Sequence, residues 1–368
     1  MASFIYWRDY LRPRPRPYVR KRTPLDPDTL LNGVSDEDCI DMFRLDKEGI
    51  EFLTQKLASS PYLARKTRAG LPVKCQLLVA LKYYATGCFI SGLKNICNMK
   101  LCASSVVNCI TNVSMALAEL SEDFLSFPLD KQTILNTKDG FQQYGGFPAC
   151  IGAIDGTHIQ IKPPSVNEEI YVGRKGFHSI NVQVVCDHNL MLTDVVVKWP
   201  GSTHDTAIYN LSGVKDLVDE YLNSSGCNGW LIGDSGYPLR PSLMVPLSDP
   251  QTPQEIAYNK ALVKCRNSVE RCLGVLKSRF RVLDRKSGGG IQYHLELCGN
   301  VILACCVLHN YCRMRNMDFP VDTDTEKKIR EDARLKRFNE PELKPANETE
   351  KQELKRGERL RQRVIDSF

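Results

Sequence analysis

Three acidic residues in different local settings constrain the fold of this chain more than any other feature. Asp155 lies inside the apolar run 151–161, which predicts a buried strand, and Asp234 ends a second apolar run at 230–233. Glu270 lies in a run with helical spacing of its apolar residues, about 100° around the predicted helix from Val269. If that helix packs its apolar stripe on a sheet, it brings Glu270 toward the two strand acids.

The residues between the first two acids predict two further strands and a helix. Runs 179–186 and 191–199 are strand-like, and the turn sequence between them, at 187–189, has hairpin spacing. A helix follows, and its predicted N-cap is one of three residues: Ser202, Thr203 or Asp205. This order predicts an α/β fold, a ribonuclease H-like mixed sheet with flanking helices.

Six motifs follow one another along the chain in a fixed order. They are Cys150-Ile151-Gly152-Ala153-Ile154-Asp155-Gly156-Thr157-His158, Arg174-Lys175-Gly176-Phe177-His178-Ser179, Trp199-Pro200-Gly201-Ser202, Gly233-Asp234-Ser235-Gly236-Tyr237, Ser278-Arg279-Phe280-Arg281 and Leu303-Ala304-Cys305-Cys306-Val307-Leu308-His309-Asn310. In this order they resemble the PIF/Harbinger transposases and the nucleases derived from them, which are DDE superfamily endonucleases. The resemblance implies a metal-dependent nuclease that hydrolyses phosphodiester bonds in DNA, with possible transfer of the freed strand.

The acids can be assigned roles in such a site. Hard divalent cations prefer oxygen ligands, and two metal ions about 4 Å apart can activate a water and neutralise the leaving oxygen. We predict Asp155, Asp234 and Glu270 as catalytic residues and as ligands of Mg²⁺ or Mn²⁺. Asp205 is a further predicted metal ligand, and its alternative role is to stabilise a helix N-terminus.

Four basic residues are predicted to contact DNA. Arg174 and Lys175 precede a glycine that lets backbone approach a phosphate closely, while Arg266 and Lys277 share one helix face with Glu270. The last two could instead orient the acid, or form a surface ion pair of little energetic value.

The predicted domain layout places the nuclease domain at 145–315. Residues 35–130 have helical periodicity, with Ser35 and Ser104 as predicted caps, and form either a helix-turn-helix-like domain or a plain helical bundle. Residues 1–34 form an arm with six basic residues between Arg12 and Arg22, predicted to serve nuclear import or phosphate contact, or to be a solvated tail. In the charged tail, 316–368, we expect a solvated helix or disorder, with nucleic-acid or protein contact by 355–363 as the alternative.

The cysteines and the apolar runs indicate the cellular compartment in which this chain folds. Fifteen cysteines, an odd number without zinc-like spacing, favour a reducing intracellular compartment. No run is as long as a bilayer requires, so we expect no membrane contact and a nuclear location, with cytoplasm as well. The resemblance implies DNA and a Myb-like DNA-binding protein as partners, and paired cuts would suit a homodimer.

Two classes of function remain open from the sequence. The first is the active nuclease, and the second is a non-cutting DNA-binding or protein-interaction factor that keeps the transposase fold. No acid is replaced by Asn, Ala or Gln, which favours the first class. A two-carboxylate glycosidase would explain neither the helix acid nor the basic arm.

Overall fold

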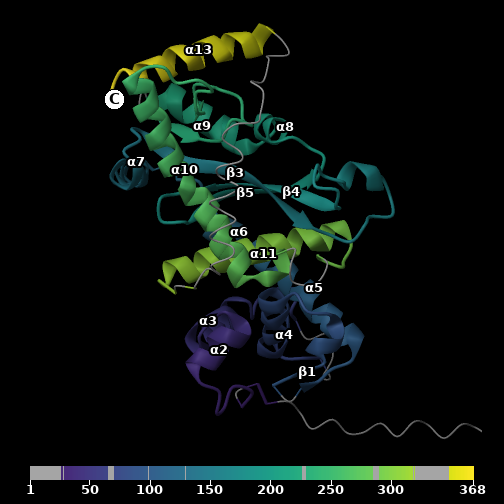
Figure 1. Cartoon of the computed structure of the whole chain (residues 1–368). Helices are drawn as coiled ribbons and strands as arrows, with labels where there is room; N and C mark the ends of the chain where they lie inside the picture. Colours follow the sequence, from purple (N-terminus) through teal and green to yellow (C-terminus); the bar gives the residue numbers. More distant parts are fainter. Residues whose placement is uncertain are drawn as a thin grey trace, which may run out of the picture.

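The computed structural model describes residues 26–27, 29–64, 70–97, 99–128, 130–225, 229–284, 290–317, 319 and 348–368. The predicted basic arm at 12–22 lies outside these residues. Within them, the sheet occupies the middle of the molecule, the N-terminal helices lie at one end, and helix α13 lies at the other (Figure 1).

A mixed sheet of five strands forms the centre, in the order β5-β4-β3-β6-β7. Its strands are β3 (Cys150–Gln160), β4 (Ser179–Cys186), β5 (Leu192–Pro200), β6 (Trp230–Ile232) and β7 (Leu243–Met244). β4 runs antiparallel to β3 and β5, whereas β6 runs parallel to β3 and β7. The predicted ribonuclease H-like sheet is confirmed, including both strands of the hairpin.

Buried polar side chains hold the hairpin turn between β4 and β5. The Asp187 carboxylate accepts hydrogen bonds from the backbone N–H groups of Asn189 and Met191, each at 2.8 Å. Two residues of a neighbouring helix complete the turn: His309 Nε2 lies 2.8 Å from the Leu190 carbonyl, and Asn310 accepts from the Leu192 N–H at 2.8 Å. Burial lowers the pKa of His309 to about 4, so this imidazole is a neutral structural group.

Helices connect and cover the strands. α8 (Asp205–Asn210) and α9 (Gly213–Ser225) join β5 to β6, and the long α10 (Pro253–Arg279) follows β7. A capping box starts α10, because Thr252 accepts from the Glu255 N–H and Glu255 accepts from the Thr252 N–H. The predicted N-cap of α8 was wrong: His204 occupies that position without a side-chain cap bond, and Asp205 is the first helical residue.

Helix α11 (Leu295–Met314) lies between the sheet and the N-terminal helices (Figure 1). It packs against both β5 and α5. By length and composition it could cross a membrane, but 72% of its apolar window is buried inside the fold. This burial identifies α11 as a core helix that joins the two halves of the structure.

The N-terminal part is mainly helical. Its helices are α2 (Asp36–Phe43), α3 (Lys47–Lys56), α4 (Val73–Thr86), η1 (Ile90–Leu93), α5 (Ala103–Glu119) and α6 (Ser121–Phe124). The next helix, α7 (Lys131–Gly145), packs against β3 and α10 beside the sheet (Figure 1). Ser35 caps α2 as predicted, accepting from the Asp38 N–H at 3.0 Å. The predicted cap of α5 was wrong, because the helix begins at Ala103 and Ser104 lies within its first turn.

A small ribbon replaces part of the predicted helical run in this region. β1 (Asn95–Ile96) pairs with β2 (Met99–Lys100), with Ile96 and Met99 buried. In each two-residue strand, one buried apolar residue is next to one exposed residue. So short a pattern fits a strand as well as a helix, so the sequence could not distinguish them. Two further short helices complete the described chain: η2 (Glu168–Tyr171) and η3 (Arg281–Leu283).

Candidate active site

Asp155 and Asp234 lie side by side on one face of the sheet. In the parallel pairing of β3 with β6, Ala153 is opposite Ile232, and each acid lies two residues farther along its chain. Residues two apart in a strand point to the same face, and neighbouring strands are about 4.8 Å apart. Their exposed fractions are only 4% for Asp155 and 7% for Asp234.

Helix α10 covers the face to which these two acids point. Lys277 Nζ donates to Thr157 Oγ1 at 2.6 Å, and Thr157 shares the face of Asp155 on β3. About two and a half turns toward the N-terminus of the helix, Ser268 Oγ lies 3.8 Å from Cys186 Sγ on β4. Glu270 lies between these two contacts and is 8% exposed, so its carboxylate faces the interior with the strand acids.

The Arg266 guanidinium is the positive charge within this acidic site. Its Nη2 lies 2.7 Å from Glu270 Oε1, and Arg266 is 2% exposed. Burial alone would lower the pKa of Arg266, but the carboxylates of Glu270, Asp155 and Asp234 raise it above its usual value. The charges of all three carboxylates therefore act on one guanidinium, and Glu270 is the one in contact with it.

The charges and donor atoms of this site suit a divalent cation. Three carboxylates face one guanidinium, so a cation would offset the excess negative charge, and carboxylate oxygens are the ligands that Mg²⁺ and Mn²⁺ prefer. Among the residues that the structure describes, however, no three His, Cys, Asp or Glu side chains are gathered closely enough to hold a metal. Glu270 pairs with Arg266 instead, so it must change partner to become a ligand.

Asp205 lies on the opposite face of β3. A Cβ placed on Gly156 would lie 2.4 Å from Asp205 Oδ1, and the side chain of residue 156 points away from the face of Asp155. Asn181 fixes this carboxylate, donating to Asp205 Oδ1 at 2.9 Å and to the Thr203 carbonyl at 2.9 Å. Asp205 thus approaches β3 at Gly156, on the face opposite the Asp155 side chain, and its role as a metal ligand stays a prediction.

Sequence reasoning missed the polar groups around Asp205. Asn181 and Gln183 lie on its face of β4, and both atoms of the buried Gln183 amide lack a hydrogen-bond partner. Ser179, Asn181 and Gln183 alternate with valine and isoleucine, and this polar stripe at a period of two was a usable signal. Tyr237 also approaches the acids: burial, followed by the charges of Asp205, Asp155 and Asp234, raises its pKa well above the usual value.

The four predicted DNA-contacting residues fall into three settings. Arg174 and Lys175 are exposed on the tight loop before β4, where Arg174 Nη2 lies 3.0 Å from His204 Nδ1. Lys277 is half-buried beside the acids on the α10 face. Arg266 is buried, so its position fits the alternative role of orienting Glu270 rather than contact with DNA.

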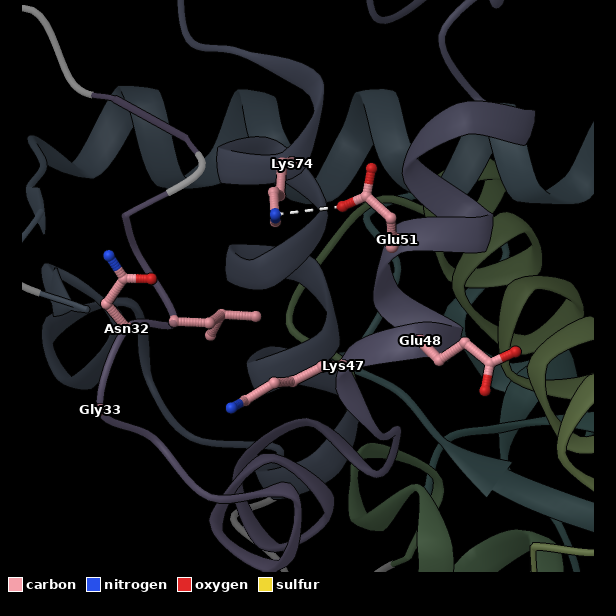
Figure 2. A pocket seen from close by; sticks show the side chains of 7 residues that line it. Asn32, Gly33, Lys47, Glu48, Glu51 and Lys74 are labelled. Atoms are coloured by element: carbon pink, nitrogen blue, oxygen red, sulfur yellow. Dashed lines mark hydrogen bonds and ion pairs between the residues drawn. The ribbon is translucent and has the colours of Figure 1, made fainter.

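A cavity of about 560 Å³ lies elsewhere, among the N-terminal helices. Lys47 and Lys74 project toward it, and Lys74 Nζ pairs with Glu51 Oε2 at 3.1 Å (Figure 2). Glu48 also lines the cavity, and its Oε2 lies 2.8 Å from Arg315 Nη2. None of the convergent acids lines this cavity, so it is separate from the candidate active site.

Comparisons with known proteins identify the family to which this chain is similar. The family model of the DDE superfamily endonucleases matches residues 154–310, which include Asp155, Asp205, Asp234 and Glu270. HARBI1 of Mus musculus, named as a candidate nuclease, is 37% identical over 290 residues, 78% of this chain and 81% of that protein. HARBI1 of Homo sapiens is 36% identical over the same shares of both chains. An ALP1-like protein of Arabidopsis thaliana is 30% identical over 211 residues, 53% of this chain and 50% of its own length. No solved structure gives a significant match.

Proposed function

Because this chain belongs to the DDE superfamily endonucleases, in the group that includes HARBI1, we propose that it is a metal-dependent DNA endonuclease. One observation carries the proposal. Asp155 and Asp234 share one face of adjacent parallel strands, beneath the helix that bears Glu270. We assign the catalytic roles to these three acids, with strand transfer as a further step open to the same site.

The proposed chemistry divides between the cation and the side chains. When bound, Mg²⁺ or Mn²⁺ supplies an activated water and stabilises charge on the leaving oxygen. Asp155 and Asp234 supply oxygen donors from neighbouring strands, and their burial keeps the site poor in water, which strengthens electrostatic interactions there. Lys277, held by Thr157 on the same face, is placed to attract a phosphate.

Arg266 has a positioning role in this proposal. It keeps the Glu270 carboxylate ionised and directed inward until another cation competes for it. When Glu270 exchanges the Arg266 guanidinium for a metal ion, only its side chain has to move, and the backbone of α10 can stay in place.

A second candidate function is favoured by the same ion pair. If Glu270 never leaves Arg266, the chain is a DNA-binding factor that keeps the fold and does not cut. For both candidates we propose DNA and a Myb-like protein as partners, from the family resemblance. A homodimer would suit paired cuts. The basic run at 12–22 and the resemblance together support a location in the nucleus and also the cytoplasm.

Metal-dependent DNA cleavage is the test of this function. We expect the purified chain to nick supercoiled plasmid with Mg²⁺ or Mn²⁺ and not with EDTA. Asp155→Asn, Asp234→Asn and Glu270→Gln should each lower the rate at least about a hundredfold, because each removes charge that the transition state requires. The rate is measured by gel densitometry, and circular dichroism checks folding.

Asp205→Asn is the matched control, since it also changes one carboxylate to an amide in the same fold. We expect it to lower the rate about tenfold or less, as a change outside the metal ligands. Absence of cleavage by the unmodified chain, with DNA binding intact and the Myb-like protein added, would favour the non-cutting factor. A rate that falls only for Asp205→Asn would move the site to the other face of β3.

A further inference from the structure

Helix α13 (Glu348–Ile365) is docked on the nuclease fold through its acidic residues. Arg240, which is 5% exposed, places its Nε 2.9 Å from Glu353 Oε2 and its Nη2 4.0 Å from Glu350 Oε1. Lys215 of α9 lies 4.0 Å from Glu353 Oε1. The helix expected from the polar sequence is therefore present, but the expectation that it is solvated or disordered was wrong, since Glu350 and Glu353 face the protein.

Close packing fixes which face of α13 turns inward. A Cβ on Gly357 would lie 3.1 Å from the Arg240 backbone, so the two chains touch at this glycine. Val364 and Ile365 are 5% and 3% exposed, and the ring of the terminal Phe368 lies 6.2 Å from that of Tyr258 on α10. These contacts leave the helix no freedom to rotate about its axis.

The opposite face of α13 is a row of basic side chains. Lys355, Arg359 and Arg363 are exposed and recur every four residues, so they lie one above another about 6 Å apart, with exposed Arg356 beside them. Three exposed acids border this row: Glu358 lies at its flank, Glu348 lies beyond its N-terminal end in an ion pair with Lys351 at 3.2 Å, and Asp366 lies beyond its C-terminal end, accepting from Gln362. We name Lys355, Arg356, Arg359 and Arg363 the α13 basic row.

We infer that the α13 basic row binds the phosphate backbone of the duplex on which the nuclease acts, at the end of the molecule opposite the N-terminal helices (Figure 1). The inference rests on the proposed function for its substrate, DNA. A duplex carries one negative charge about every 1.7 Å along its axis, so the roughly 12 Å from Lys355 to Arg363 faces several phosphates. The contact reads no sequence and adds affinity and orientation.

DNA fits this surface better than an anionic membrane does. An interfacial helix needs a free apolar face to enter lipid. The apolar residues of α13 are already used, because Val364 and Ile365 belong to the buried core and Leu354 and Leu360 pack against it. Only charged and polar side chains remain outward, which suits a surface of phosphates.

A salt titration of DNA binding tests the inference without cleavage. The full chain, in EDTA, is titrated against a fluorescent duplex of roughly 30 bp with an arbitrary sequence. This duplex is longer than the α13 basic row. We compare it with the triple variant Lys355→Ala/Arg359→Ala/Arg363→Ala. Each lost phosphate contact removes about 0.9 from the slope of log K against log salt, so the slope should fall by about 2 to 3. Alanine preserves the helix, and circular dichroism checks the fold.

The matched control removes three exposed lysines from other elements, Lys131→Ala/Lys198→Ala/Lys260→Ala. We expect its slope to change by less than about 1, because it loses the same charge outside the row. Equal slopes for the α13 variant and the parent, or equal losses in both variants, would overturn the inference. So would binding of phosphatidylserine vesicles that depends on the row while DNA binding does not. Because EDTA prevents cleavage in every sample, failure here is distinct from failure of the nuclease assay.

Discussion

The two faces of β3 both carry acidic side chains, but they hold them in different ways. On the α10 face, the buried Arg266 guanidinium pairs with Glu270 and feels the charges of Asp155 and Asp234, so charge is offset by charge. On the other face, Asp205 is held by the neutral amide of Asn181 and lies against Gly156. An ionic partner can be exchanged for a cation, whereas Asp205 is held by a neutral hydrogen bond and packs close to the Gly156 backbone.

This difference comes from one alternating strand. Asp155 and Thr157 point to the α10 face, and Gly156 and His158 point to the other, so neighbouring residues belong to separate sites. Closeness in sequence to Asp155 therefore does not show that a side chain lies on the same face of the sheet. We expect substitutions on the α10 face to change electrostatics and those on the other face to change packing.

The largest effect on stability is expected at Arg266. Arg266→Met leaves the buried Glu270 carboxylate without its ion-pair partner, so the free energy of unfolding should fall by about 3–5 kcal/mol. Urea denaturation measures it. Arg271→Met, on the exposed side of the same helix, is the matched control and should cost less than about 1 kcal/mol.

The double variant Arg266→Met/Glu270→Met separates charge from packing. Removing both charges should restore most of the lost stability, since an apolar pair can replace a buried ion pair. A double variant as unstable as Arg266→Met would mean that the α10 face depends on shape rather than on charge, and the contrast between the two faces would fail.

A smaller effect is expected at Gly156. The added methyl group of Gly156→Ala would overlap Asp205 Oδ1, so the free energy of unfolding should fall by about 1–3 kcal/mol. Gly213→Ala, where an added Cβ meets nothing within 4 Å, is the control and should be within about 0.5 kcal/mol of the parent. Thermal denaturation compares them. Adding Asp205→Ala to Gly156→Ala should restore the free energy of unfolding. If it does not, the loss of stability does not come from overlap with the Asp205 side chain.

The smallest effect depends on pH and concerns Asp194 on β5. Burial raises its pKa to about 6, and its Oδ2 has no hydrogen-bond partner. Since the folded pKa lies above the ordinary value, the cost is present above about pH 6 and is relieved as the pH falls through 6. Asp194→Asn should raise the free energy of unfolding by about 1–2 kcal/mol at pH 8, and the gain should shrink toward pH 4.

Urea denaturation at several pH values measures this dependence. Asp187→Asn is not a suitable control because its carboxylate holds the hairpin turn, so the exposed Asp216→Asn of α9 serves instead. A gain from Asp194→Asn that is independent of pH would show that ionisation of this carboxylate is not the cause.

Local patterns predicted much of the fold. The alternation in 179–186, the turn at 187–189 and the cap at Ser35 each depend on residues close in sequence, and the structure confirms all three. The family resemblance and the mixed sheet are confirmed as well. Asp155 and Asp234 could be selected from the sequence because one lies inside an apolar run and the other directly follows one, which are both local patterns.

Contacts between distant residues could not be read from the sequence. Which face of the sheet Asp205 lies on depends on how the segment after β5 packs against Gly156. The burial of Arg266 depends on how α10 packs against the sheet. Helix α13 looks fully polar, but Arg240, more than a hundred residues earlier, supplies the partner for its acids. Where a charge is paired across such distances, local periodicity cannot distinguish a solvated helix from a docked one.

The most direct measurement is the anomalous diffraction of crystals soaked in Mn²⁺. We predict a peak on the α10 face of β3, about 2.1 Å from carboxylate oxygens of Asp155 and Asp234, with Glu270 turned from Arg266. Asp205 should keep its contact with Asn181. A peak beside Asp205 with none at Asp155, or no peak with Glu270 still paired to Arg266, would contradict the account.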